Sequence, residues 1–261
     1  MRDKNYIKSL ERGLRILEIL GQSSRPLTLT QIANLSELNK TATQRFLHTF
    51  CSLGYLNREE NKSYVLGARV LSLGYSFLNS SNLATMSKPY LDELSSEVNK
   101  TVNLAILDNV ETLFLYRKEV RRFMKPDLAP GSKLPVYAGA LGKILLAGLG
   151  DKELENRLGQ MKLHPITAKT ITSKKGLWEE IKKTRKRGYS VCDQELSMDL
   201  YSVAVPLING QGEVVAAINV SMEASYKASA DIEKIIWKLT KTGQMVSSIL
   251  GYQGPYPSFS T

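Results

Sequence analysis

The amino-acid sequence predicts a two-domain protein, in which a small helical N-terminal domain is followed by a larger α+β domain with a mostly antiparallel sheet. A chain of 261 residues is long enough for two domains that each bury a core. Residues 7–53 carry apolar residues at helical spacing with short polar breaks. From residue 100 onward, alternating apolar runs are interleaved with helical stretches, which is typical of the α+β class.

The formal net charge of +10 favours a polyanionic partner. Residues 1–80 hold eleven lysines and arginines against six aspartates and glutamates, a net charge of +5, and the other 181 residues carry the remaining +5. Positive charge is therefore about twice as dense in the N-terminal part. This placement predicts that the N-terminal domain meets the polyanion.

The two cysteines, Cys51 and Cys192, lie far apart in sequence and in different predicted domains. That separation argues against a disulfide framework or a paired-cysteine metal site, and it fits a reducing cytoplasm. No apolar run approaches the roughly 18 residues that a membrane span needs. We therefore expect a cytoplasmic protein without a membrane partner.

Three helices are predicted before residue 54. Helical spacing predicts the first over Ile7–Leu20, and Gly21 and Pro26 end it. Thr28 or Thr30 is expected to cap the second helix by accepting a free backbone N–H, with Ile32, Ala33 and Leu35 facing inward. The segment SELN predicts a turn, after which Asn39 caps a third helix.

The third helix, Lys40–Leu53, is apolar on one side and carries hydrogen-bond donors at its leading end and outer face. Arg and Lys can bond guanine, Gln can pair with adenine, and Thr can reach phosphate or a thymine methyl group. In helix-turn-helix proteins this end of the second helix of the pair reads base edges. An isolated helix of this kind is more often simply solvated on its polar face.

The segment after the third helix favours the DNA-binding interpretation. Gly54 stops the helix, and strand-like Tyr55–Asn57 and Tyr64–Leu66 flank a polar tip, Arg58–Ser63. Three helices and such a hairpin predict a winged helix-turn-helix that binds double-stranded DNA. The expected DNA contacts are Thr30, Lys40, Thr41, Thr43, Gln44, Arg45 and His48 on the helices and Arg58 and Lys62 on the wing.

The helical segment Ala68–Leu78 is too apolar for a free linker. It either packs on its own domain or pairs with a second copy. We favour the second, because a duplex reader usually needs two half-sites and hence a dimer on a palindromic site. The predicted organisation is a DNA-binding domain at 1–67, a linker helix at 68–82, the second domain at 83–251 and a disordered tail at 252–261.

The second domain is predicted to begin with a helix, Leu83–Asn99, and a hairpin, Val102–Asp108 and Glu111–Val120. The remaining predicted helices are Tyr137–Leu149, Asp151–Met161, Lys174–Arg187 and Lys227–Leu250, and the remaining strands are Tyr189–Asp193, Leu200–Leu207 and Val214–Met222.

No catalytic or metal-binding pattern is present. The only histidines, His48 and His164, are far apart, there is no GxSxG elbow, and GALGKILLA lacks the residues of a phosphate-binding loop. We expect no cofactor and no enzyme activity. The alternative is an enzymatic or metabolite-binding second domain that uses the first domain for assembly, which the shortage of titratable catalytic residues disfavours.

Polar residues on neighbouring strands of the second domain indicate a small-molecule pocket. Asp193 and Glu195 end one strand, Ser202 lies in the next, and Asn219 and Ser221 alternate with apolar residues along the third. Taken one at a time, each of these residues more often makes a structural hydrogen bond than a ligand contact. Their convergence in an apolar setting is the usual composition of a ligand site.

Six segments in order make the chain resemble the IclR family (isocitrate lyase regulator family). They are SLERGLRILEIL, KTATQRFLHTFCSLGYL, YVLGARVLSLG, GSKLPVYAGALGKILLAGL, RKRGYSVCDQELSMDLYSVAVPL and GEVVAAINVSME. The resemblance implies a winged helix-turn-helix, a dimerising linker helix and a GAF-like effector domain. It also implies a bacterial transcription factor, often a tetramer built as a dimer of dimers, that responds to a small organic acid.

Within the family, GSKLPVYAGALGK and CDQEL look most like the branch that controls aromatic-acid and β-ketoadipate catabolism. An aromatic or keto acid is therefore the expected effector, and repression is the expected action. The resemblance implies contacts from the backbone N–H groups of Ala140 and Leu141 and from Asp193, Ser202, Asn219 and Ser221. Arg117 or Arg121 is expected to supply the cation for an anionic ligand.

Overall fold

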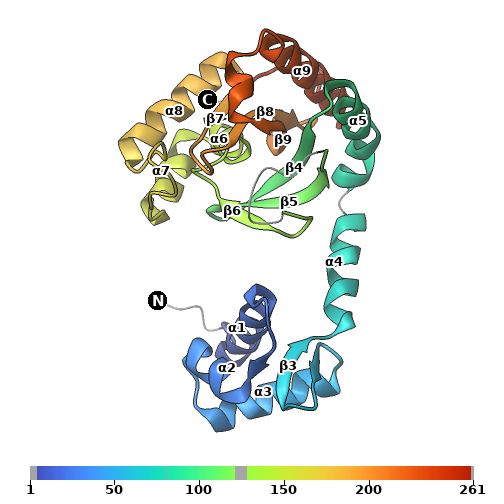
Figure 1. Ribbon diagram of the computed structural model, residues 1–261, viewed down its shortest axis with the longest axis vertical. Coiled ribbons are helices and arrows are strands. Elements are labelled where there is room, and N and C mark those ends of the chain that lie inside the picture. The colour runs from blue at the N-terminus through green and yellow to red at the C-terminus, as the bar shows by residue number, and fades with distance from the viewer. Residues whose placement is uncertain (1–4, 81, 121–127, 260–261) are drawn as a thin grey trace. The chain divides into compact units, whose positions relative to one another are not determined.

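The structure is a computed structural model that describes residues 5–80, 82–120 and 128–259. The chain divides into two compact units, Met1–Ser80 and Ser81–Thr261 (Figure 1). Within the described ranges, no helix is both long and apolar enough to cross a membrane. In the same part of the chain, no group of three or more His, Cys, Asp or Glu side chains could hold a metal ion.

Unit 1 is a winged helix-turn-helix, as the sequence predicts. In order it contains α1 (Lys8–Gln22), β1 (Leu27–Thr28), α2 (Leu29–Ser36), α3 (Lys40–Ser52), β2 (Leu56–Arg58), β3 (Ser63–Leu66) and α4 (Ala68–Ser80). The strands form an antiparallel sheet in the order β1-β3-β2. Strand β1 was not predicted, because two residues are too few to show alternation.

Caps fix where α2 and α3 begin. The Thr28 side chain accepts from the backbone N–H of Gln31, and the Gln31 side chain accepts from that of Thr28, which makes a capping box. Asn39 Oδ1 accepts from the N–H of Ala42 at 2.8 Å and caps α3. Glu37, in the left-handed region at φ 59°, forms the tight turn between the two helices.

The core of unit 1 joins these helices to the wing. Its buried members are Ile16, Leu20, Leu27, Ile32, Leu47, Leu56 and Tyr64. The expectation that Leu35 faces inward is wrong, because Leu35 lies on the solvent side of α2 with 54% of its surface exposed. The buried positions of α2 are Ile32, Ala33 and Ser36.

Unit 2 is built on one antiparallel sheet with strand order β6-β5-β4-β9-β8-β7, so the predicted α+β architecture is confirmed. Its strands are β4 (Thr101–Asp108), β5 (Glu111–Lys118), β6 (Lys133–Pro135), β7 (Ser190–Asp193), β8 (Leu200–Ile208) and β9 (Val214–Glu223). Its helices are α5 (Asn82–Val98), α6 (Ala140–Ala147), α7 (Asp151–Gln160), α8 (Lys174–Arg187), η1 (Ala224–Ala228) and α9 (Ile232–Ile249).

Helices cover both faces of this sheet (Figure 1). Helix α6 packs on the face that presents Ala105, Ala204 and Ala217, whereas α5 and α9 pack on the other. The predicted final helix was too long at its start, since a 3₁₀ turn ends at Ala228 and α9 begins only at Ile232. Strand β6 was also missed, because it lies in a loop rich in proline and charge.

The prediction of a disordered tail is wrong for residues 252–259. The Tyr256 hydroxyl donates a 2.6 Å hydrogen bond to the carbonyl oxygen of Pro206 on β8, and it lies against Gly243 of α9. Phe259 packs on the apolar core beneath α6. Composition suggested disorder because a segment with two prolines and a glycine shows no periodicity, although its aromatic side chains bury well.

Candidate DNA-binding and effector-binding sites

Helix α3 presents a continuous polar stripe to solvent. Thr41, Gln44, Arg45 and His48 recur at three- and four-residue spacing and are all exposed, and Lys40 is exposed at the helix start. The helix contains no acidic residue. Phe46 and Phe50 on its inner side contact α1, where Gly13 leaves room for their rings. This packing holds α3 so that the donor-rich stripe faces outward.

The wing is less basic than its two cations suggest. Arg58 and Lys62 are exposed, but Glu59 and Glu60 lie between them at the hairpin tip. Glu59 also accepts a 3.0 Å hydrogen bond from the Ser63 hydroxyl, which fixes the turn. The two carboxylates therefore balance Arg58 and Lys62, and the net charge of the tip is close to zero.

A polar row crosses the sheet of unit 2 on the face that α6 covers. Asn103 on β4 lies opposite Arg117 on β5 and Asn219 on β9, and Ser221 lies opposite Ser202 on β8. Two residues further along the strands the same face is apolar, with Ala105, Ala217 and Ala204 under α6. The polar row therefore lies at the N-terminal end of α6, next to the apolar patch that the body of the helix covers.

Hydrogen bonds link the members of this row. Arg117 Nη1 donates to Asn103 Oδ1 at 2.9 Å, and Asn103 Nδ2 donates to Asn219 Oδ1 at 2.7 Å and to Ser221 Oγ at 3.3 Å. Asn219 Nδ2 donates to Ser221 Oγ at 3.2 Å. Since Ser221 Oγ accepts two hydrogens, its own hydrogen is left to donate elsewhere.

The first turn of α6 closes a pocket over the polar row. Residues 139–142 line it together with Asn103, Arg117, Ser202, Asn219 and Ser221. Gly139 caps α6 without a side-chain hydrogen bond, so the first backbone N–H groups of the helix point outward from its N-terminus. The remaining wall is mainly apolar and is formed by Thr112, Phe114, Leu128, Leu134, Pro135, Leu196 and Leu200.

Two donors of the pocket have no acceptor among the described residues. The residue Ser202 is 2% exposed and its hydroxyl makes no hydrogen bond there, and Arg117 Nε is buried without a partner. Arg117 Nη2 pairs with Glu119 Oε1 at 3.0 Å. A helix N-terminus, a guanidinium and two hydroxyls form a site suited to an anion or to oxygen acceptors.

Family models match both units. The model described as the IclR helix-turn-helix domain matches residues 9–60, and the model described as bacterial transcriptional regulator IclR C-terminal matches residues 75–248. The chain belongs to the IclR family of bacterial transcriptional regulators. It is therefore a DNA-binding regulator of transcription, and the helix-turn-helix is its DNA-binding domain.

Similarity to individual proteins supports the same family. This IclR-family regulator is 35% identical over 233 residues to the Pca regulon regulatory protein of Pseudomonas putida, covering 89% of this chain and 80% of the relative. It is 34% identical over 218 residues to the transcriptional repressor IclR of Escherichia coli strain K12, covering 82% and 80%. An IclR homolog from Microbacterium hydrocarbonoxydans, solved with 4-hydroxybenzoate, shares the fold with a TM-score of 0.79 at 23% identity, covering 93% and 99%.

The regulator's structure corrects one of the expected DNA contacts. Thr43 is fully buried, and its hydroxyl donates to the backbone carbonyl of Asn39 at 3.0 Å. It faces inward because it lies four residues before Leu47, which is also buried. Thr30, in the first turn of α2, is exposed.

The structure places only some of the expected effector contacts in the pocket. Ala140, Leu141, Ser202, Asn219, Ser221 and Arg117 line the pocket, whereas Asp193 does not. The Asp193 carboxylate is bound by Lys227 at 2.7 Å and lies 3.8 Å from Lys169. The hydrogen bond from Lys227 is the main cause that lowers the pKa of Asp193, so this side chain is an anion with partners of its own. Arg121 lies outside the described residues.

Asn103 is the residue that sequence reasoning missed. It is 1% exposed and joins Arg117 to Asn219 at the centre of the polar row. The sequence did contain a signal, namely a single amide within the apolar run VNLAIL. A polar side chain on a buried strand is expected to have a hydrogen-bond partner, which indicates a structural or functional role.

Proposed function

We propose that this regulator binds palindromic DNA as a homodimer and changes its affinity for that DNA when a small organic acid occupies the unit 2 pocket. The observation that carries the proposal is the pocket itself, which brings the backbone N–H groups of the α6 N-terminus together with Arg117 Nε, unpartnered in the described part of the chain, and the neutral side chains of the polar row. The ligand acts by binding one arrangement of the dimer better than another. Its expected action is relief of repression in the cytoplasm.

The DNA part of the proposal rests on α3 and the wing. Lys40, Thr41, Gln44, Arg45 and His48 would enter the major groove, since they occupy the exposed leading end and stripe of the reading helix. Thr30, Arg58 and Lys62 would reach the phosphates on either side, because all three are exposed on elements that flank α3.

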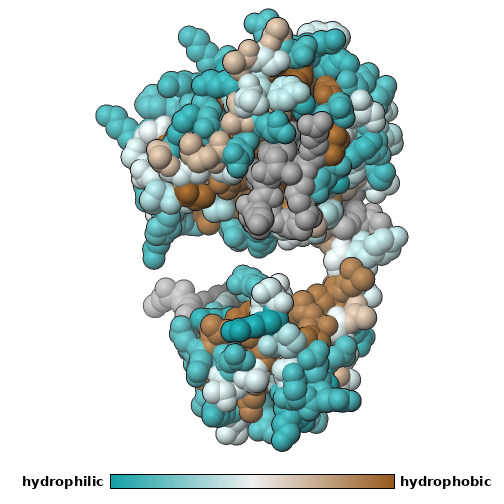
Figure 2. Space-filling model, in the orientation of Figure 1, coloured by the Kyte–Doolittle hydropathy of each residue, from teal (hydrophilic) through white to brown (hydrophobic). Residues whose placement is uncertain are grey.

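Dimerisation is supported by the apolar surface of α4. Leu71 is 76% exposed, Leu73 58% and Tyr75 64%, and Figure 2 shows apolar surface at this helix. A monomer rarely leaves such a group of large side chains in water. Pairing of α4 with a second copy would bury it, and we expect a further dimer-of-dimers association, as the family resemblance implies.

The ligand class follows from the lining. An aromatic or keto acid would place its carboxylate at the α6 N-terminus, its body against Phe114 and Leu134, and an oxygen acceptor toward Ser202 or Arg117. The Microbacterium hydrocarbonoxydans homolog was solved with 4-hydroxybenzoate. That compound is the first probe, and a panel of keto acids is the second.

The test is a thermal-shift titration of the full chain with these acids, because a ligand that binds the native state raises its melting temperature. An effective acid should stabilise the wild type but not Ser202→Ala or Arg117→Met, while Arg157→Met on α7, away from the pocket, should respond as the wild type does. The same acid should change binding to operator DNA in fluorescence anisotropy. Full stabilisation of both pocket variants would refute the proposed site.

A further inference from the structure

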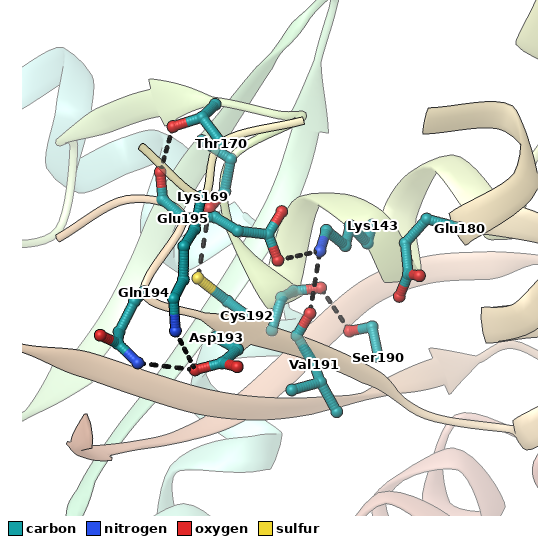
Figure 3. Close-up of polar contacts among 12 residues, drawn as sticks. Lys143, Lys169, Thr170, Glu180, Ser190, Val191, Cys192, Asp193, Gln194 and Glu195 are labelled. Atoms are coloured by element: carbon teal, nitrogen blue, oxygen red, sulfur yellow. Dashed lines mark hydrogen bonds and ion pairs between the residues drawn. The ribbon is translucent and has the colours of Figure 1, made fainter. Parts of the chain in front are cut away.

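Lys143 is the largest of the fully buried side chains, with 1% of its surface exposed, and it does not line the pocket. Its ammonium group donates to the carbonyl oxygen of Val191 on β7 at 2.9 Å and forms an ion pair with Glu195, which lies just after β7 (Figure 3). Removing two charges from water is costly, and apolar replacements of such pairs are often as stable or more stable. A gain in stability is therefore a poor explanation of this pair.

The pair connects two parts of the pocket wall. The four residues that precede Lys143 line the pocket from α6, and Leu196, the residue after Glu195, lines it from the loop between β7 and β8. Lys143 and Glu195 thus lie behind the wall, where they fix its two sides to each other without facing the ligand.

Side chains attach the loop Gln194–Asp199 to its surroundings, while a backbone hydrogen bond from Gln194 to the carbonyl oxygen of Leu200 at 2.8 Å closes its base. Thr167 Oγ1 donates to the carbonyl oxygen of Gln194, and Thr170 Oγ1 donates to that of Glu195, each at 2.7 Å (Figure 3 shows the second). Gln194 itself is in the left-handed region at φ 65°. Between β7 and β8, Leu196 is therefore held at the pocket by its neighbours' polar contacts.

The Glu195 carboxylate is only partly satisfied. Oε2 is buried without a hydrogen-bond partner among the residues that the structure describes. Burial raises the pKa of Glu195, and the nearby Lys143 ammonium opposes that rise without cancelling it. Among the described residues, Lys143 is the side-chain partner that holds this carboxylate.

We propose that Lys143 and Glu195 are positioning residues for the effector: their buried ion pair fixes the loop Gln194–Asp199, and with it Leu196, against the first turn of α6 and so sets the affinity for the organic acid. This inference rests on the proposed function in taking the pocket as the effector site. Its structural half, the fixing of the loop, can be tested without a ligand.

The decisive variant is the double substitution Lys143→Met with Glu195→Gln in the full chain. It removes both charges at similar side-chain volume, so its melting temperature should stay within a few degrees of the wild type. Hydrogen exchange at residues 194–200 should nevertheless become at least about tenfold faster, while exchange in β9 stays unchanged. Affinity for 4-hydroxybenzoate, or for whichever acid stabilises the wild type, should fall about tenfold.

Controls separate positioning from general stability. The double variant Lys238→Met with Glu97→Gln removes a partly exposed ion pair between α9 and α5 and should alter neither loop exchange nor affinity. If Lys143→Met with Glu195→Gln fails to fold, Glu195→Asp keeps both charges but shortens one partner, and it should speed loop exchange to a smaller extent.

The outcomes distinguish the two proposals. If no acid binds the wild type, the effector function fails, and the exchange data alone decide whether the pair positions the loop. Unchanged exchange at 194–200 in a folded variant overturns the positioning role. Unchanged affinity for the acid in a variant that loses the ion pair also overturns the positioning role.

Discussion

The side-chain amide of Asn103 on β4 donates a 2.7 Å hydrogen bond to Oδ1 of Asn219 on β9, directly across the sheet. Asn103 Oδ1 in turn accepts from Arg117, so one buried amide satisfies groups on both neighbouring strands. A buried polar group that loses its hydrogen-bond partner lowers the free energy of unfolding by about 1–3 kcal/mol. Because Asn103 is the partner of groups on two strands, it is the structural centre of the pocket.

Asn103→Leu should lower the free energy of unfolding by about 2 kcal/mol or more, because it removes a hydrogen-bond partner from both Arg117 and Asn219. Urea denaturation followed by circular dichroism measures this. Asn156→Leu on the exposed side of α7 is the comparison and should stay within about 0.5 kcal/mol of the wild type. An equally small effect of Asn103→Leu would mean that the polar row tolerates the loss.

Arg45→Ala should weaken operator binding, and because it removes one positive charge from the groove-facing stripe of α3, it should lower the slope of log affinity against log salt by about one. Fluorescence anisotropy at several salt concentrations gives both values. Thr43→Val is the matched control on the same helix, since Thr43 is buried and faces the core. A folded Thr43→Val variant should bind with the wild-type salt slope, and an altered slope there would contradict the orientation of α3.

Gly142→Ala should destabilise unit 2 by about 3 kcal/mol, because a methyl group on Gly142 would overlap the backbone carbonyl of Val136. Gly139→Ala is the control three residues earlier, where nothing lies within 4 Å of the added carbon. Thermal melting of the two full-length variants compares them. Equal melting temperatures would show that α6 can move away from the preceding segment at little cost.

Asp92 should make stability depend on pH in the acid range. The hydrogen bond from Lys88, followed by that from Tyr116, lowers the pKa of Asp92 below its ordinary value. A lowered carboxyl pKa stabilises the fold above the unfolded pKa of about 3.9, and this stability is lost as pH falls through the folded value. Asp92→Asn should therefore melt below the wild type at pH 6, and the gap should shrink below pH 4.

The control for that titration is Thr85→Ala, which removes no ionisable group from the same helix. Its difference from the wild type should not vary with pH. A gap between Asp92→Asn and the wild type that persisted unchanged to pH 2 would show that the Lys88 and Tyr116 contacts do not act through the charge of Asp92.

The sequence predicted the elements whose signal is local. Helix α8 has the predicted bounds, Lys174–Arg187, because Ser173 caps it and Gly188 stops it at positive φ. The β4–β5 hairpin and the reading helix were likewise predictable from period and polarity. Strands β1 and β6, of two and three residues, carry no such pattern and depend on their partners.

Part of the pocket was predictable for the same reason. Asn219 and Ser221 alternate with apolar residues along one strand, so their shared face follows from period alone, whereas Ser202 joins them through the register of β8 with β9. Asn103 and the Lys143–Glu195 pair were not found, since residues that meet across strands or across 52 positions of chain leave no local trace. Thr43 was misplaced because it was assigned by its polar side chain, whereas its spacing of four residues from Leu47 puts it on the buried side of α3.

The packing of residues 252–259 on β8 and α9 also has a kinetic consequence during synthesis. Domains generally fold as units and in chain order as they leave the ribosome. Unit 1 is complete at residue 80 and can fold while the rest is still being made. Unit 2 completes its packing only after Tyr256 and Phe259 have emerged, so for most of translation a folded DNA-reading domain precedes a sensor that lacks these contacts.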